Sequence, residues 1–257
     1  MNLNLHDKVF IISGSSRGIG KGIAETFLTE GAKVVLTGRR EDCLDSTYIE
    51  FNDKFPRNVI RCVGDINNEH VLDEIEKTVL DEWLRIDGIV ANAASIKPVG
   101  DWNIPEEDWN WYLTNNLKLA VCFVTKFVEH LKNTKGSIII ISSIAGIEEI
   151  GAPLPYSASK AALNMYSKGL AKKLARDHIR VNTIAPGNIL FQDGNWDKKQ
   201  KADSAAIQKM LDEKVPLNRF GSPEEIGCIA AFLSSEKAGF ITGGCFVVDG
   251  GQTSKFI

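Results

Sequence analysis

Short runs of apolar residues alternate along the chain with longer segments whose apolar residues recur at helical spacing. The short runs are typical of strands buried on both faces of a sheet, and they occupy residues 9–12, 33–37, 59–63, 86–90, 138–141, 180–185 and 245–248. The segments between them predict amphipathic helices. This alternation predicts an α/β fold with a doubly wound parallel sheet of about seven strands, helices on both faces and ligands at the carboxyl ends of the strands.

The alternation breaks down between residues 190 and 214, where aromatic side chains stand among polar neighbours and a basic run precedes the next helix. A long segment at the strand ends is typical of a functional loop. We therefore expect residues 188–214 to form a lid that is mobile when the site is empty. No linker, internal repeat or low-complexity segment divides the chain, so residues 1–257 are predicted to form a single domain.

Composition and charge exclude several classes of function. The formal net charge of −3 argues against a general nucleic-acid or anionic-membrane binder. No apolar run approaches the ~20 residues of a membrane span, and the start of the chain does not resemble a signal peptide. The five cysteines and four histidines lack zinc-type spacing, so no metal site is expected. Reduced cysteines and no targeting segment predict a cytoplasmic protein.

A glycine-rich turn follows the first predicted strand and opens a helix. Gly14, Gly18 and Gly20 lie in this turn, together with Ser16 and Arg17. Glycines let the backbone approach a diphosphate, and a helix N-terminus offers free N–H groups and a positive dipole end. The alternative interpretation is a tight turn that needs glycine for its backbone alone.

Two further strand ends carry side chains that suit a nucleotide. Arg39 and Arg40 follow the second strand, where an acidic residue would favour a free ribose 2′-hydroxyl and an arginine favours a 2′-phosphate. Arg17 could approach the same phosphate from the glycine turn. Asp65 follows the third strand and could meet an adenine edge, although aspartate is also a common loop cap. The alternative for the arginines is a solvated surface position.

The fifth strand and the helix after it carry acid–base chemistry. Ser143 stands at the strand end, and Tyr156 and Lys160 lie one turn apart on the next helix. A nearby cation can favour the phenolate of a tyrosine, and a serine hydroxyl can hydrogen-bond a substrate carbonyl. Such a pair also arises by chance on helices. In the preceding helix the residues alone do not distinguish Asn115 from Asn116 as a further polar group of the site.

Together these motifs resemble the short-chain dehydrogenase/reductase family, whose fold is a Rossmann-type sheet, and the resemblance covers nearly the whole chain. It implies a catalytic tetrad of Asn116, Ser143, Tyr156 and Lys160. In this tetrad Lys160 lowers the tyrosine pKa and holds the nicotinamide ribose, and Asn116 anchors a water. It also implies cofactor contacts from Gly14, Ser16, Arg17, Gly18, Ile19, Gly20, Arg39, Asp65, Ile66, Asn92, Tyr156, Lys160, Pro186, Gly187 and Ile189.

Three positions depart from the family pattern. Ser13 replaces the usual threonine but keeps its hydroxyl, and Ala94 replaces a glycine along the path of the cofactor. Phe191 stands where the family places a threonine that contacts the nicotinamide amide. We expect Phe191 to line the substrate pocket instead, with the backbone near Ile189 supplying the lid's cofactor contact.

The resemblance implies an NADP(H)-dependent oxidoreductase that transfers a hydride between the nicotinamide and a ketone or secondary alcohol. Its 3-oxoacyl-carrier-protein reductase branch is the most similar, so the expected substrate is a small-molecule carbonyl such as a 3-oxoacyl thioester. A sugar or polyol dehydrogenase and a non-catalytic cofactor-binding scaffold are the alternatives. The family also implies a homotetramer in which the Asn116 and Tyr156 helices meet.

Overall fold

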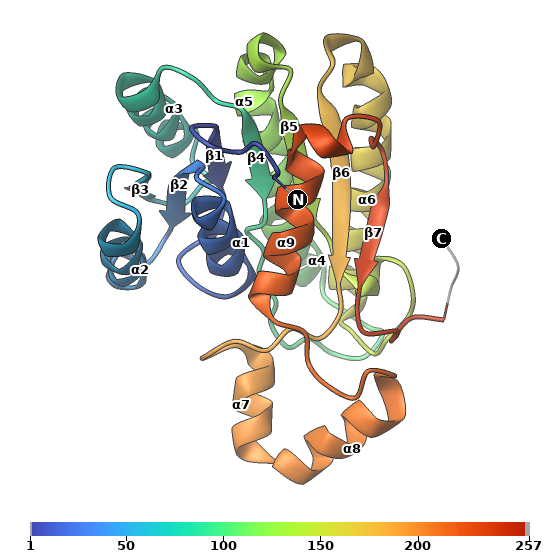
Figure 1. Cartoon of the computed structure of the whole chain (residues 1–257). Helices are drawn as coiled ribbons and strands as arrows, with labels where there is room; N and C mark the ends of the chain where they lie inside the picture. The colour runs from blue at the N-terminus through green and yellow to red at the C-terminus, as the bar shows by residue number, and fades with distance from the viewer. Residues whose placement is uncertain (1, 255–257) are drawn as a thin grey trace.

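The computed structural model describes residues 2–254. In this part of the chain seven parallel strands form one sheet, in the order β3-β2-β1-β4-β5-β6-β7 (Figure 1). The strands are β1 Val9–Ile12, β2 Lys33–Gly38, β3 Val59–Val63, β4 Gly88–Ala91, β5 Ser137–Ile141, β6 Arg180–Pro186 and β7 Cys245–Val248. Strand order reverses at β1, which pairs with both β2 and β4. The predicted doubly wound parallel sheet is confirmed.

Helices cover both faces of this sheet. One layer contains α1 (Gly18–Thr29), α2 (Glu41–Lys54) and α9 (Pro223–Ser234), and the other contains α3 (Glu69–Trp83), α5 (Leu119–Thr134) and α6 (Leu154–Leu174). Alternate residues of β1 pack against the two helix layers. Phe10 and Ile12 pack with the first, whereas Val9 and Ile11 pack with the second. Because both faces are buried, the strands are apolar throughout, which explains the pattern of the sequence.

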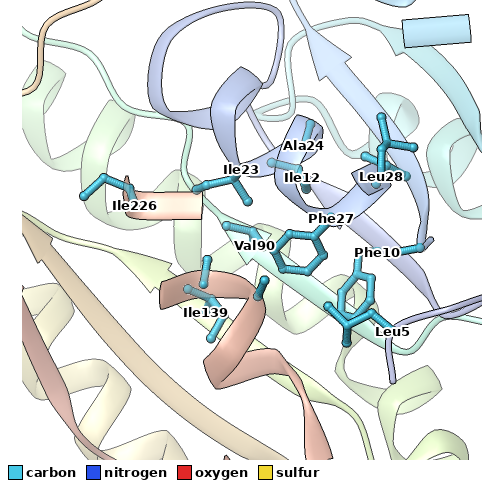
Figure 2. Packing of buried hydrophobic residues seen from close by; sticks show 14 of the residues in the cluster. Leu5, Phe10, Ile12, Ile23, Ala24, Phe27, Leu28, Val90, Ile139 and Ile226 are labelled. Atoms are coloured by element: carbon cyan, nitrogen blue, oxygen red, sulfur yellow. The ribbon is translucent and has the colours of Figure 1, made fainter. Parts of the chain in front are cut away.

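The first of these cores is centred on aromatic packing between β1 and α1. The rings of Phe10 and Phe27 meet edge to face, with their centroids 4.6 Å apart. Ile23 and Ile226 bring α1 and α9 together above them (Figure 2). This contact places the start of α1 at a defined height above the sheet. It thereby positions the glycine turn that precedes the helix.

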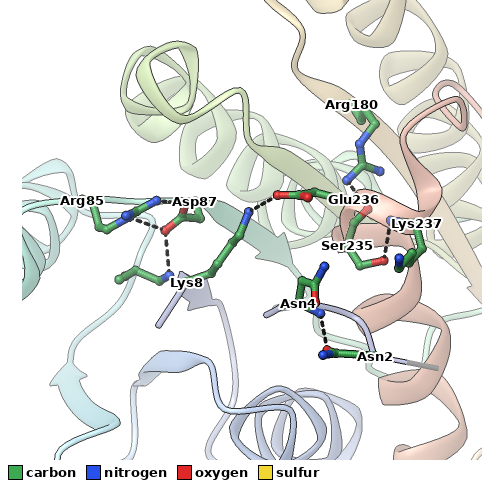
Figure 3. A network of polar contacts seen from close by, with 10 residues as sticks. Asn2, Asn4, Lys8, Arg85, Asp87, Arg180, Ser235, Glu236 and Lys237 are labelled. Atoms are coloured by element: carbon green, nitrogen blue, oxygen red, sulfur yellow. Dashed lines mark hydrogen bonds and ion pairs between the residues drawn. The ribbon is translucent and has the colours of Figure 1, made fainter. Parts of the chain in front are cut away.

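Polar contacts close the amino-terminal edge of the sheet. Asp87 is 5% exposed, and it accepts hydrogen bonds from the Val9 backbone and the Arg85 guanidinium. Arg180 donates to the carbonyl of Ser235 at the end of α9, where a cation suits the helix dipole (Figure 3). Burial lowers the pKa of Arg180. These partners hold the start of β1 and the loop after α9 at this edge of the sheet.

Two regions differ from the regular alternation. Residues 188–214, expected as a lid, contain α7 (Asn195–Ala202) and α8 (Ser204–Lys214), which lie beyond the carboxyl ends of the strands. They have a small apolar core of their own around Ile207 and Leu211. The helix that carries the two asparagines is not continuous. It runs as α4 (Glu106–Tyr112), a π-helical turn (Leu113–Lys118) and then α5.

Candidate active site

The glycine turn forms a cradle at the N-terminus of α1. Gly14 has a φ of +65°, and a Cβ on Gly20 would lie 2.3 Å from the Gly14 carbonyl oxygen, so side chains are excluded from both positions. Arg17, the N-cap residue, makes no capping hydrogen bond with its side chain, and the first turn of α1 has no acidic residue. The helix therefore presents uncapped N–H groups and its positive end, which fit a diphosphate.

Asn92 and Ser13 hold this cradle in place. The Asn92 amide donates to the carbonyls of Ser13 at 2.9 Å and Gly14 at 3.0 Å. The Ser13 hydroxyl donates to the Val90 carbonyl and accepts from the Asn92 backbone N–H. The serine therefore links the ends of β1 and β4 with the single hydroxyl that a threonine would also supply.

A cleft runs from the glycine turn along the carboxyl edge of the sheet. Ser95, Ile96, Leu119 and Phe191 line it. Most of the expected cofactor residues line it as well, namely Gly14, Ser16, Arg17, Gly18, Ile19, Gly20, Arg39, Asp65, Ile66, Asn92 and Tyr156. The structure does not place Lys160, Pro186, Gly187 and Ile189 in this lining. Ile189 is 6% exposed and packs in the core instead.

Three arginines stand at one end of this cleft, and their partners differ. Arg40 pairs with Asp42 at 3.1 Å, and this hydrogen bond lowers the pKa of the Asp42 carboxyl. Arg17 reaches the Asp193 carbonyl of the lid at 3.5 Å. Arg39 has only a long contact of 3.9 Å with Asp65, and its side chain is 60% exposed. Among the described residues neither Arg17 nor Arg39 has a close carboxylate partner, so both keep more of their charge than Arg40.

Strand β5 and helix α6 bring together the expected acid–base residues. Ser143 follows β5 and hydrogen-bonds Tyr156, while its hydroxyl also accepts from the Ala145 backbone N–H at 3.1 Å. Lys160 is 2% exposed and donates to the Ile141 carbonyl at 2.9 Å. Its ammonium nitrogen lies 5.7 Å from the centre of the Tyr156 ring. Among the described residues Lys160 has no carboxylate partner, which leaves ammonium N–H groups for a bound ribose.

Burial dominates the electrostatics of this group. It raises the pKa of Tyr156, although the hydrogen bond with Ser143 acts in the opposite direction. It also lowers the pKa of Lys160 to about 8. The protein residues alone do not lower the tyrosine pKa, because desolvation disfavours both charged forms, so the expected lowering with a bound nicotinamide stays a prediction. At neutral pH Tyr156 is protonated and can act as a proton donor.

The π-helical turn distinguishes the two asparagines. Asn116 is fully buried, and its amide donates to the carbonyls of Ser95 at 2.9 Å and Tyr112 at 3.1 Å. Its oxygen accepts from the Ser95 backbone N–H at 3.2 Å. Asn115 is less buried and bonds only its own helix, at the Trp111 carbonyl. Asn116 thus ties the loop after β4 to the helix, a contact that the sequence did not indicate.

Phe191 lies on the glycine turn. A Cβ on Gly18 would be 2.9 Å from two carbons of its ring. The ring therefore lines the cleft at the glycine turn, and the expectation that it lines the substrate pocket stays a prediction. Within residues 2–254 no cluster of three or more His, Cys, Asp or Glu side chains could hold a metal ion, and none of the helices could cross a membrane.

Comparison with known proteins identifies the family of this chain. A family model described as enoyl-(acyl carrier protein) reductase matches residues 14–253. The 3-oxoacyl-[acyl-carrier-protein] reductase FabG of Chlamydia muridarum is 34% identical over 253 residues, which cover 98% of this chain and 100% of that protein. The chain belongs to the short-chain dehydrogenase/reductase family. It is an oxidoreductase that acts on a carbonyl or alcohol with a nicotinamide cofactor.

Other relatives in this family have different substrates. The L-sorbose reductase of Gluconobacter frateurii, solved in complex with NADPH and L-sorbose, has a TM-score of 0.93 and 33% identity, and each chain is covered completely. An NAD-dependent glycerol dehydrogenase of Listeria innocua is 32% identical, with 99% of this chain and 97% of that protein covered. Short-chain dehydrogenase/reductases this similar to the chain thus differ in both cofactor and substrate.

Proposed function

We propose that this protein is an NADP(H)-dependent reductase of a ketone, with the secondary alcohol as product. The observation that carries the proposal is the position of Arg39, a weakly paired guanidinium at the end of the cleft that begins at Tyr156. A 2′-phosphate would give Arg39 a stronger partner than Asp65 supplies. The L-sorbose reductase, whose structure contains NADPH, supports the same cofactor choice.

In this proposal a bound nicotinamide supplies the hydride, and the side chains handle the proton and the substrate oxygen. Tyr156 donates its phenolic proton to that oxygen, and Ser143 hydrogen-bonds it. Lys160 offers its N–H groups to the ribose from a buried position. Asn116 holds the loop after β4, and by family resemblance it also anchors a water that returns the proton.

For the substrate we propose a 3-oxoacyl thioester or a similar carbonyl compound, because the FabG relative matches along the full chain. The L-sorbose reductase and the glycerol dehydrogenase support a sugar or polyol as the second candidate. Reduction of an acetoacetyl thioester without reduction of L-sorbose would favour the first, and the reverse would favour the second. A scaffold without turnover is disfavoured, because it would not need to keep Asn116, Ser143, Tyr156 and Lys160.

We also propose a homotetramer. Exposed apolar side chains on the helices that carry Asn116 and Tyr156 support it: Leu113, Leu154 and Met165 are 37%, 45% and 73% exposed. Such side chains are typical of a surface that another subunit covers. Light scattering at micromolar concentration should give the mass of four chains, and a monomer would contradict the proposal.

The cofactor choice is tested by titrating wild type and Arg39→Ala with NADPH and NADH, followed by fluorescence. Losing a charge-assisted contact to phosphate should weaken NADPH by roughly ten- to a hundredfold and leave NADH within about twofold. Arg40→Ala is the matched control, because Asp42 already neutralises that neighbouring guanidinium. Equal weakening of both cofactors by Arg39→Ala would remove Arg39 from the phosphate site.

A further inference from the structure

Tyr112 connects three parts of the site that are far apart in sequence. It ends α4 just before the π-helical turn and is fully buried. Its ring meets the ring of Tyr156 edge to face, with centroids 6.4 Å apart and planes at 69°. Its carbonyl accepts the hydrogen bond from the Asn116 amide. One side chain and its backbone therefore touch two members of the expected tetrad.

The hydroxyl of Tyr112 binds the loop that follows β4. It accepts from the Lys97 backbone N–H at 3.0 Å and donates to the Lys97 carbonyl. The Lys97 side chain reinforces this contact, since its ammonium pairs with Asp108 at 2.5 Å and lies 4.8 Å from the centre of the Trp111 ring. The loop is thus held at Lys97 from both its backbone and its side chain.

This loop forms a wall of the cleft. Ser95 and Ile96, immediately before Lys97, line the cleft beside Tyr156. Asn116 fixes Ser95, and Tyr112 fixes Lys97, so the lining segment is tied down on both sides. A loop with only one of these ties would sample other positions, because its backbone would make fewer hydrogen bonds to the helix.

We propose that Tyr112 is a positioning residue for carbonyl reduction, whose hydroxyl sets the loop that lines the cleft beside Tyr156 and whose ring orients Tyr156. The proposal rests on the function proposed above, in which Tyr156 donates the proton. The packing alone does not need a tyrosine, because a phenylalanine would fill the same space. A buried hydroxyl is costly unless it is bonded, and here both of its bonds go to the loop. Burial also raises the pKa of Tyr112, so the hydroxyl stays protonated.

Two variants separate the hydroxyl from the ring. Tyr112→Phe keeps the ring against Tyr156 and removes both bonds to Lys97. We expect it to raise KM for the carbonyl substrate about tenfold, with NADPH affinity within about twofold and the pH profile unchanged. Tyr112→Leu also removes the ring. It should admit water beside Tyr156, reverse part of the effect of burial and move the kinetic pKa of that tyrosine downward.

Tyr166→Phe is the matched control, since it removes another partly buried tyrosine hydroxyl from α6 that bonds Thr125. It should match wild type in KM and pH profile. Hydrogen exchange of the Lys97 amide adds a measurement that needs no substrate, and Tyr112→Phe should accelerate it at least about tenfold. If Tyr112→Leu does not fold, Tyr112→Phe still decides the role of the hydroxyl.

The outcomes distinguish this proposal from the function on which it rests. A Tyr112→Phe protein that matches wild type in KM and in Lys97 exchange would overturn the role of the hydroxyl. An unchanged pH profile in a folded Tyr112→Leu protein would overturn the role of the ring. A wild-type protein without turnover on any carbonyl would instead contradict the proposed function.

Discussion

Replacing Lys160 by methionine should abolish turnover and yet stabilise the folded protein at pH 7. The lysine is 2% exposed, and burial lowers its pKa from an ordinary value of 10.5 to about 8. At ~1.4 kcal/mol for each pKa unit, this difference corresponds to about 3 kcal/mol of destabilisation while the group is charged. Methionine has a similar length and no charge, so this cost disappears in the variant.

The variant also loses one hydrogen bond, which offsets part of this gain in stability. Lys160 donates to the Ile141 carbonyl at 2.9 Å, and leaving that oxygen unpaired costs about 1 kcal/mol. The net expectation is a free energy of unfolding about 2 kcal/mol higher for Lys160→Met at pH 7. Urea denaturation of the two proteins, followed by tryptophan fluorescence, measures this difference.

The pH dependence of the free energy of unfolding is a second test of the sign of this effect. Between pH 8 and 10.5 the unfolded wild-type chain keeps the lysine proton, whereas the folded chain has released it. Wild-type stability therefore rises with pH across this window, relative to the methionine variant, and the gap should close. Lys126→Met is the control with the opposite sign, because Asp73 and Glu76 pair with Lys126 and raise its pKa.

The reasoning would be refuted by a Lys160→Met protein that is less stable than wild type at pH 7. It would also be refuted by a difference that stays constant from pH 7 to pH 10. Either result would mean that the folded protein stabilises the ammonium by a contact that outweighs its desolvation. The control must lose stability at pH 7 for the comparison to be valid.

Three further changes test separate parts of the structure. Tyr156→Phe should reduce kcat at least about a thousandfold and leave NADPH affinity within about twofold, as measured by steady-state kinetics and titration. Gly20→Ala places a Cβ 2.3 Å from the Gly14 carbonyl and should weaken NADPH binding roughly tenfold or more in the same titration; unchanged affinity would contradict the cradle. Ser222→Ala breaks the capping box with Glu225 and should lower the free energy of unfolding by about 1 kcal/mol at pH 7. The hydrogen bond with Arg219, followed by that with the Ser222 backbone N–H, lowers the pKa of Glu225 to about 2, so the contribution of this carboxylate is present above its ordinary value of 4.5 and is lost as the pH falls toward about 2. Ser222→Ala removes only the hydroxyl that accepts from the Glu225 backbone N–H, so its effect should be the same in urea titrations at pH 7 and at pH 3.

The fold was predictable because buried parallel strands read as continuous apolar runs. Local signals also marked the glycine turn, since its residues lie within a few positions of one another. The position of Phe191 was not predictable. Its ring rests on Gly18, which is more than 170 residues away in the chain, and no local pattern encodes that contact.

The π-helical turn was not predictable for a related reason. The sequence predicts a helix that carries Asn115 and Asn116, and nothing local favours a widened turn within it. Asn116 stabilises the turn. Its side-chain amide donates a hydrogen bond to the Tyr112 carbonyl, and its other hydrogen bonds join the Ser95 backbone on a separate loop. Because π-turns are rare and are often found at functional sites, this one marks the position where the helix meets the site. The sequence could indicate an asparagine of interest, but only the loop contact distinguishes Asn116 from Asn115.

The burial of Tyr156 and Lys160 bears on the proposed acid–base chemistry. Tyr156 and Lys160 are both desolvated, so the protein keeps the tyrosine protonated and holds a lysine whose charge destabilises the fold. Lys160 has no carboxylate partner among the described residues, and its hydrogen bond to the Ile141 carbonyl offsets only part of the cost of burial. Perturbed groups of this kind cluster at functional sites, where the cost of burial is retained for the sake of activity. The proposed acid–base role therefore rests on the energetics of Lys160 as well as on family resemblance, and the stability of Lys160→Met tests the first of these.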